Sequence, residues 1–144
     1  MLIARFEGNE EEKKRELQLF TEKAQQPQYL NMYDKYLALL EAEDLANPSR
    51  AIEIAMKEVL NRPTPQSYDL LAWSYYSKGE QKKAIELAQL NVEGKTAEPE
   101  AIYHLGMMYK NIDQKKSHRY LTTALASSFE LGPAISTTIQ DQLR

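Results

Sequence analysis

Apolar residues recur along most of the chain at the spacing of an amphipathic helix. Between residues 67 and 75, Tyr68, Leu71, Ala72 and Tyr75 stand at positions i, i+3, i+4 and i+7. This spacing places all four side chains on one face of a helix. No segment alternates apolar and polar residues with a period of two, which is the pattern of a half-buried strand. The pattern therefore predicts an all-α protein of about seven helices and no strands.

The helical pattern itself repeats along the chain. The matched pairs, each 34 residues apart, are Leu71 with Leu105, Ala72 with Gly106, and Tyr75 with Tyr109. A second match joins residues 51–55 to residues 84–88, 33 positions on. A period of this length holds two helices and a turn, which indicates an array of helix-turn-helix units.

Proline, glycine and asparagine interrupt the pattern at regular intervals. Breaks are predicted within units at 47–49, 78–80 and 111–113, and between units at 61–65 and 96–99. Proline suits a loop or the first turn of a helix, and Gly79 suits a left-handed helix end. The predicted organisation is one continuous solenoid domain, with a partial repeat or N-terminal helix at 1–30, units at 31–62, 65–96 and 98–128, and a capping helix at 132–144.

The two ends of the sequence carry different signals. Aligning Gly8 with Gly79 makes residues 1–7 the closing turns of a helix whose beginning is missing, so we expect a fragment of a longer protein. Near the other end, Ile135, Ile139 and Leu143 recur every four residues among polar ones. One apolar face with a polar back is what an array needs to close its last exposed core.

This combination of period and residues resembles the tetratricopeptide repeat. The residues that carry the resemblance are the Leu-small-x-x-Tyr sets Leu71, Ala72, Tyr75 and Leu105, Gly106, Tyr109, with Gly79 in the turn and Ala84 opening the second helix. The unit at 31–62 keeps Ala51 but leaves its register open. Units two and three also resemble C-terminal repeats of bacterial proteins of unassigned role. The resemblance implies an α-solenoid with a right-handed superhelix, whose first helices line a concave groove.

A second row of residues would face that groove if the resemblance holds. The expected partner-binding residues are Gln66, Asp69, Trp73, Tyr76 and Ser77 in the second unit, with Glu100, Tyr103, Met107, Lys110 and Asn111 in the third. Aromatic rings with a polar tip are favoured binding anchors, and methionine adapts to varied partners. The alternative is that neighbouring first helices cover Trp73 and that the capping helix covers Met107.

Composition and charge narrow the classes of partner. The net charge is −3, and no column of Lys or Arg follows the groove, which argues against nucleic acid. Repeat domains that hold acidic chaperone tails present Lys, Asn and Arg in the groove, whereas this chain has Asp69, Trp73, Tyr103 and Met107 there. No apolar run reaches the roughly 18 residues of a membrane span. An upstream signal peptide, if removed, would place the protein in the periplasm or outside the cell; otherwise the cytoplasm is expected.

No catalytic or cofactor motif stands out. The chain has no cysteine, and its two histidines, His104 and His118, fall on different expected helices, so we expect no metal site and no cofactor. His104 is expected to be a packed ring beside Leu105. The resulting hypothesis is a non-catalytic scaffold that binds a peptide or partner segment. The alternatives are a structural segment that forms a homodimer, and a regulatory domain of an enzyme that lies outside these residues.

Overall fold

The structure, a computed structural model, describes residues 10–24, 34–43 and 47–144, and all regular secondary structure in these ranges is helical. The helices are α2 (Glu10–Ala24), α3 (Asp34–Glu43), α4 (Pro48–Asn61), α5 (Pro65–Lys78), α6 (Gln81–Asn91), α7 (Pro99–Tyr109), α8 (Gln114–Leu125), α9 (Ser128–Leu131) and α10 (Pro133–Leu143). The all-α prediction is confirmed for the part of the chain that the structure describes. None of the helices in these ranges is long and apolar enough to cross a membrane.

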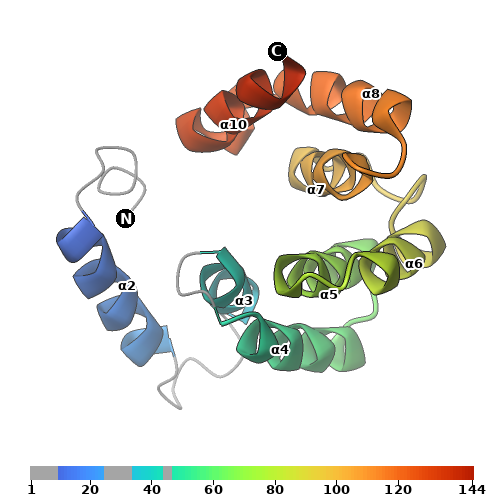
Figure 1. The fold of residues 1–144 in the computed structure, drawn as a ribbon. Coiled ribbons are helices and arrows are strands. Elements are labelled where there is room, and N and C mark those ends of the chain that lie inside the picture. The colour runs from blue at the N-terminus through green and yellow to red at the C-terminus, as the bar shows by residue number, and fades with distance from the viewer. Residues whose placement is uncertain (1–9, 25–33, 44–46) are drawn as a thin grey trace.

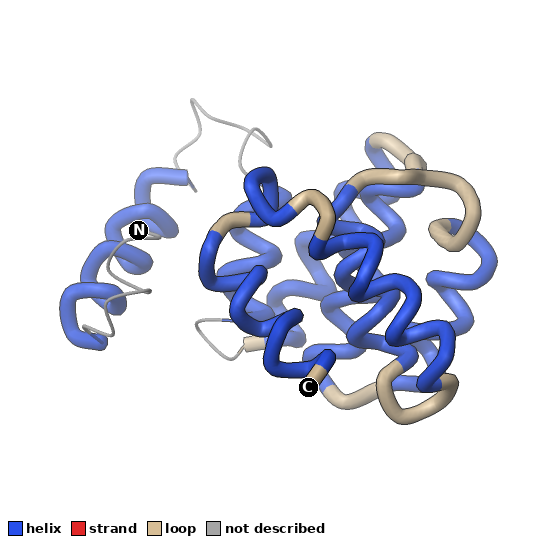
Figure 2. Tube along the Cα trace, turned by 90° about the horizontal axis from the view of Figure 1, so that it is seen from above, coloured by secondary structure: helices blue, strands red, loops and turns tan. Residues whose placement is uncertain are grey.

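The helices pack against their neighbours in sequence order. Helices α3, α5 and α7 form an inner layer, and α4, α6 and α8 form an outer layer around them (Figure 1). Each inner helix contacts the outer helix that follows it, and α5 contacts both of the other inner helices. This sequential packing is that of an α-solenoid, as expected. Helix α2 contacts α3 and lies to one side of the two layers (Figure 2).

The residues that break the helical pattern begin and end the helices as predicted. Pro48, Pro65 and Pro99 each stand in the first turn of a helix. The hydroxyl of Thr64 accepts a hydrogen bond from the backbone N–H of Ser67 at the start of α5. Gly79 ends α5 with φ of 94°, a left-handed conformation that glycine adopts without strain.

The repeat residues fill the space between the layers. Ala72, Leu105 and Tyr109 belong to one buried cluster, Leu71 belongs to a second, and Tyr75 contacts both. At Gly106, an added Cβ would lie 2.6 Å from a side-chain carbon of Leu121, so the absence of a side chain permits the close approach of α7 and α8. The packing between helices expected for these residues is confirmed.

The C-terminal region closes the last unit. Helix α10 lies against α8, with Ile139 fully buried and Ile135 and Leu143 half-buried in the same cluster. The short helix α9 precedes it and has no counterpart in the sequence expectation. At the other end, the expected closing turns at 1–7 and residues 31–33 of the first unit lie outside the described residues.

Candidate functional site on the inner helices

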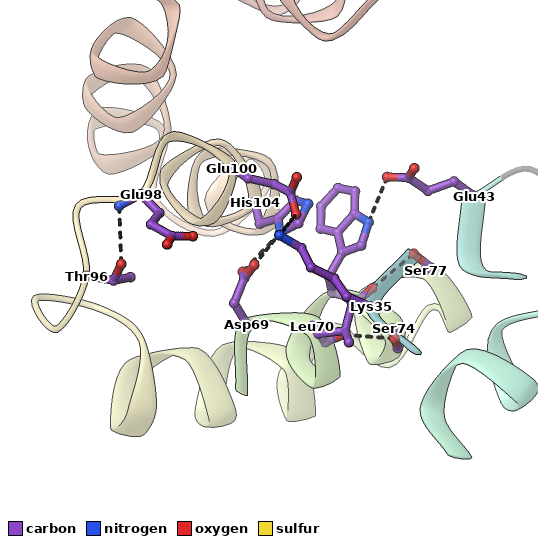
Figure 3. Close-up of polar contacts among 11 residues, drawn as sticks. Lys35, Glu43, Asp69, Leu70, Ser74, Ser77, Thr96, Glu98, Glu100 and His104 are labelled. Atoms are coloured by element: carbon purple, nitrogen blue, oxygen red, sulfur yellow. Dashed lines mark hydrogen bonds and ion pairs between the residues drawn. The ribbon is translucent and has the colours of Figure 1, made fainter. Parts of the chain in front are cut away.

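A buried pair of charged groups joins α5 to α7. Nδ1 of His104 lies 3.0 Å and 2.8 Å from the two carboxylate oxygens of Asp69, and the two residues are 2% and 5% exposed. Figure 3 shows the two side chains meeting between their helices. A carboxylate and an imidazole removed from water at this distance compensate each other, since each alone would be costly to bury.

The pair holds a proton more tightly than the separate groups would. Burial lowers the pKa of His104, but the charge and hydrogen bond of Asp69, together with the Glu100 and Glu43 carboxylates, outweigh it and the pKa is raised. Burial raises the pKa of Asp69, against the lowering influence of His104. Both shifts have the same consequence, because each keeps the shared proton on the pair to higher pH.

Two further charges stand at the solvent side of this pair. Glu100 lies one helical turn before His104 on α7, and the ammonium of Lys35 on α3 lies 3.5 Å from its carboxylate. Both side chains are partly exposed, unlike Asp69 and His104. In Figure 3, Lys35 reaches across from α3 toward the carboxylates. Asp69, His104, Glu100 and Lys35 are referred to below as the Asp–His cluster.

The indole of Trp73 packs against the Asp–His cluster. It stacks on the His104 ring with centroids 4.0 Å apart and planes 16° apart, and its Nε1–H donates a 2.9 Å hydrogen bond to Glu43 at the end of α3. Tyr76 stacks on the indole at 5.2 Å, and Tyr103 lies tilted against it at 5.8 Å. Trp73 and Tyr103 are each only 6% exposed, so residues of α3 and α7 cover the tryptophan.

The two tyrosines differ in their surroundings. Burial raises the pKa of Tyr103 to about 12, with smaller contributions from the Glu43 carboxylate and from Tyr76. Burial also raises the pKa of Tyr76, which remains partly accessible. Both phenols therefore stay neutral at physiological pH and act as aromatic surface with a hydrogen-bonding tip.

The structure brings only some of the expected binding residues together. Asp69 and Glu100 belong to the Asp–His cluster, and Trp73, Tyr76 and Tyr103 pack beside it. The other expected residues lie apart from it. Gln66 is exposed and donates to Glu98 at 3.3 Å, while Ser77 is half-buried and donates to the carbonyl of Trp73. Met107 is half-buried in the apolar cluster that contains Ile139, and Lys110 and Asn111 are exposed. Lys110 and Asn111 line a separate pocket of about 300 Å³ near the end of α10.

Three residues of the site did not emerge from the sequence as site residues: Lys35, Glu43 and His104. The repeat period contained a signal for the first two, because Lys35 and Glu43 stand 34 residues before Asp69 and Ser77. Because the register of the first unit was left open, this correspondence was not recognised. His104 is buried as expected, but its carboxylate partner had been expected to face the groove. Glu100 and His104 are spaced i, i+4, which places both on one helix face.

Comparison with known proteins found no relative of this chain. The chain matches no family model, and searches of the curated proteins and of the solved structures found no match.

Proposed function

We propose that the protein is a non-catalytic interaction module of the tetratricopeptide type, with a right-handed superhelix, that binds an extended segment of another protein along its inner helices. The observation that carries this proposal is the row of accessible side chains on α3, α5 and α7, the layer opposite α4, α6 and α8 (Figure 1). Stacked rigid helices present such a row without further ordering, which lowers the entropic cost of binding.

A partner would make different contacts here from those expected in a groove lined by exposed aromatic rings. Because Trp73 and Tyr103 are almost fully covered, a partner reaches the exposed edge of Tyr76 instead. Trp73 stacks behind Tyr76 and fixes its orientation. The half-buried Ser77 and Met107 add a polar and an adaptable apolar contact. Gln66 lies near the start of α5, and Lys110 and Asn111 follow the end of α7. These three residues are expected to contribute at the rim, where contacts add little affinity.

A partner segment that suits this surface carries an apolar side chain that contacts Tyr76 and Met107. Polar groups flank that side chain on either side. A short array in which Trp73 and Tyr103 are covered offers few strong contacts, so we expect modest affinity. The buried pair of Asp69 and His104 beneath the surface would then hold α5 and α7 in register.

One observation favours self-association as a second candidate function. On the outer layer, Met56 and Leu60 lie one turn apart on α4, and Leu60 is 84% exposed. Leu90 on α6, 34 residues after Met56, is 70% exposed. Large exposed apolar side chains of this kind are common at contacts between protein chains. Such a dimer would use the outer helices and leave Tyr76 free.

Site-specific photo-crosslinking separates these functions. A photoreactive amino acid replaces Tyr76 on the inner layer in one variant and Glu86, an exposed residue of α6, in a matched control. If the proposal is right, irradiation in an extract of the source organism gives a discrete adduct with another protein from position 76 and none from position 86. Ser77→Arg, which adds bulk beside the ring, should abolish the adduct while leaving the circular dichroism spectrum unchanged.

The outcome also distinguishes the alternative. An adduct between two copies of the chain, together with a dimeric mass by light scattering, would favour self-association. Equal labelling from both positions would contradict a binding surface on the inner layer.

A further inference from the structure

The Asp–His cluster has the donor set of a metal site. One oxygen of Asp69, one oxygen of Glu100 and one ring nitrogen of His104 all lie within 4.8 Å of one another. Donors that share one zinc ion at about 2.0–2.2 Å are separated by at most roughly 4.4 Å. Only a small rotation of the partly exposed Glu100 side chain is needed to bring the three donors onto one ion.

The scaffold holds these donors on two packed helices. Glu100 and His104 stand at positions i and i+4 of α7, and Asp69 comes from α5, which packs against α7. Asp69 and His104 are fully enclosed, and the ring of His104 is fixed by Trp73 at 4.0 Å. Ligands that are already oriented lose little freedom on binding, so a cation would meet a largely formed site.

The charges around the site favour a cation. Asp69 and Glu100 bring two carboxylates, and the Glu43 carboxylate also acts on His104 from the end of α3. Against these stands the ammonium of Lys35, at 3.5 Å from Glu100 on a side chain that is partly exposed. Lys35 thus already supplies positive charge at the mouth of the cluster, through a loose contact that a divalent ion would replace.

We propose that Asp69, Glu100 and His104 bind one divalent transition-metal cation of the Zn²⁺ type, with solvent completing its coordination on the side of Lys35. One imidazole nitrogen with two carboxylates suits Zn²⁺, Co²⁺ or Ni²⁺, whereas Mg²⁺ and Ca²⁺ prefer oxygen ligands alone. The bound ion would bridge α5 to α7 and set the angle between the second and third units. The sequence had indicated no metal site, because the third ligand comes from a different repeat.

Calorimetric titration of the metal-free full chain with zinc chloride tests the proposal. We expect one site per chain and a higher melting temperature with zinc, because zinc binds the folded state. Co²⁺ provides a second readout, since Trp73 is the only tryptophan and stacks on His104. Its fluorescence should be quenched with the same affinity that the calorimetric competition gives for Co²⁺.

Three variants distinguish a metal site from a purely structural ion pair. Glu100→Gln should weaken zinc binding at least tenfold, the scale of effect that even outer partners reach. Glu98→Gln, an exposed carboxylate two residues away, is the matched control and should leave zinc affinity unchanged. Lys35→Met should tighten zinc binding, because it removes the competing cation; a structural role for the cluster predicts no such gain.

Adventitious binding is tested at the other imidazole. His118 is exposed, and His118→Gln should leave the zinc site intact. The proposal is overturned if no zinc binds, if zinc affinity survives Glu100→Gln, or if it is lost with His118→Gln. Equal affinity for Mg²⁺ and Zn²⁺ would also overturn it, since His104 would then not be a ligand.

Discussion

At the scale of single residues, the indole of Trp73 links three inner helices. Its N–H donates to Glu43 at the end of α3, one face stacks on His104 of α7, and Tyr76 of its own helix stacks on it. A tryptophan that is both packed and hydrogen-bonded has one allowed orientation. Trp73 therefore sets how α5 is rotated between its neighbours, and with it the direction in which Tyr76 points.

We expect Trp73→Phe to lower the free energy of unfolding by about 1–2 kcal/mol, because phenylalanine keeps an aromatic ring but loses the hydrogen bond to a charged acceptor. Urea unfolding followed by circular dichroism measures the change, as the fluorescence signal is lost with the indole. A double-mutant cycle with Glu43→Ala isolates the hydrogen bond. If the two substitutions are simply additive, the bond between Trp73 and Glu43 contributes nothing and this account of Trp73 is wrong.

At the scale of helices, α7 and α8 approach closely at one glycine. The backbone carbonyl of Gly106 accepts a 2.7 Å hydrogen bond from the hydroxyl of Ser117 on α8. Leu121, one turn further along α8, fills the space where a Cβ of residue 106 would lie. The contact with Leu121 therefore leaves no room for a side chain at residue 106.

Gly106→Ala should therefore destabilise the protein, although alanine favours a helix by about 1 kcal/mol over glycine. Overpacking in a closed core costs roughly 1–3 kcal/mol, and we expect a net loss of about 1 kcal/mol. Thermal and urea unfolding measure it. In a Leu121→Ala background, which creates room for the new methyl group, the same substitution should become neutral or stabilising. A loss of equal size in both backgrounds would show that the contact with Leu121 is not the cause.

The sequence could predict features that depend on residues close together along the chain, but not contacts between residues that are far apart in it. Pro65 and Gly79 mark the ends of α5 through their own backbone preferences, so the helix boundaries could be predicted. The 34-residue period is visible directly in the sequence, and it indicated the order in which the helices pack. The pairing of Asp69 with His104 depends on how α7 is rotated against α5, which no local pattern records. The hydrogen bond of Trp73 depends on Glu43, in the unit whose register the sequence left open.

At the scale of the whole molecule, one apolar cluster runs through the helical stack to its C-terminal end. It includes Leu39 of α3, Trp73 of α5, Tyr103 of α7, Leu121 of α8 and Ile139 of α10. In a solenoid each unit contacts only its neighbours, so stability is a sum of local terms. The shared cluster couples these terms, but its members near α10 depend most directly on the capping helix.

Ile139→Ala tests how far this coupling extends. Ile139 is fully buried, so its truncation should lower the free energy of unfolding by about 2–5 kcal/mol. The matched control is Leu19→Ala, an aliphatic truncation on the exposed side of α2, which should change stability by less than about 0.5 kcal/mol. Hydrogen exchange then locates the damage. Helix α8 contacts α10, whereas the buried residues of α4 belong to a different apolar cluster from Ile139. Amides of α8 should therefore lose more protection than those of α4. Equal loss in both helices would mean that the chain unfolds as one cooperative unit, and that the capping helix stabilises the first unit as strongly as the last.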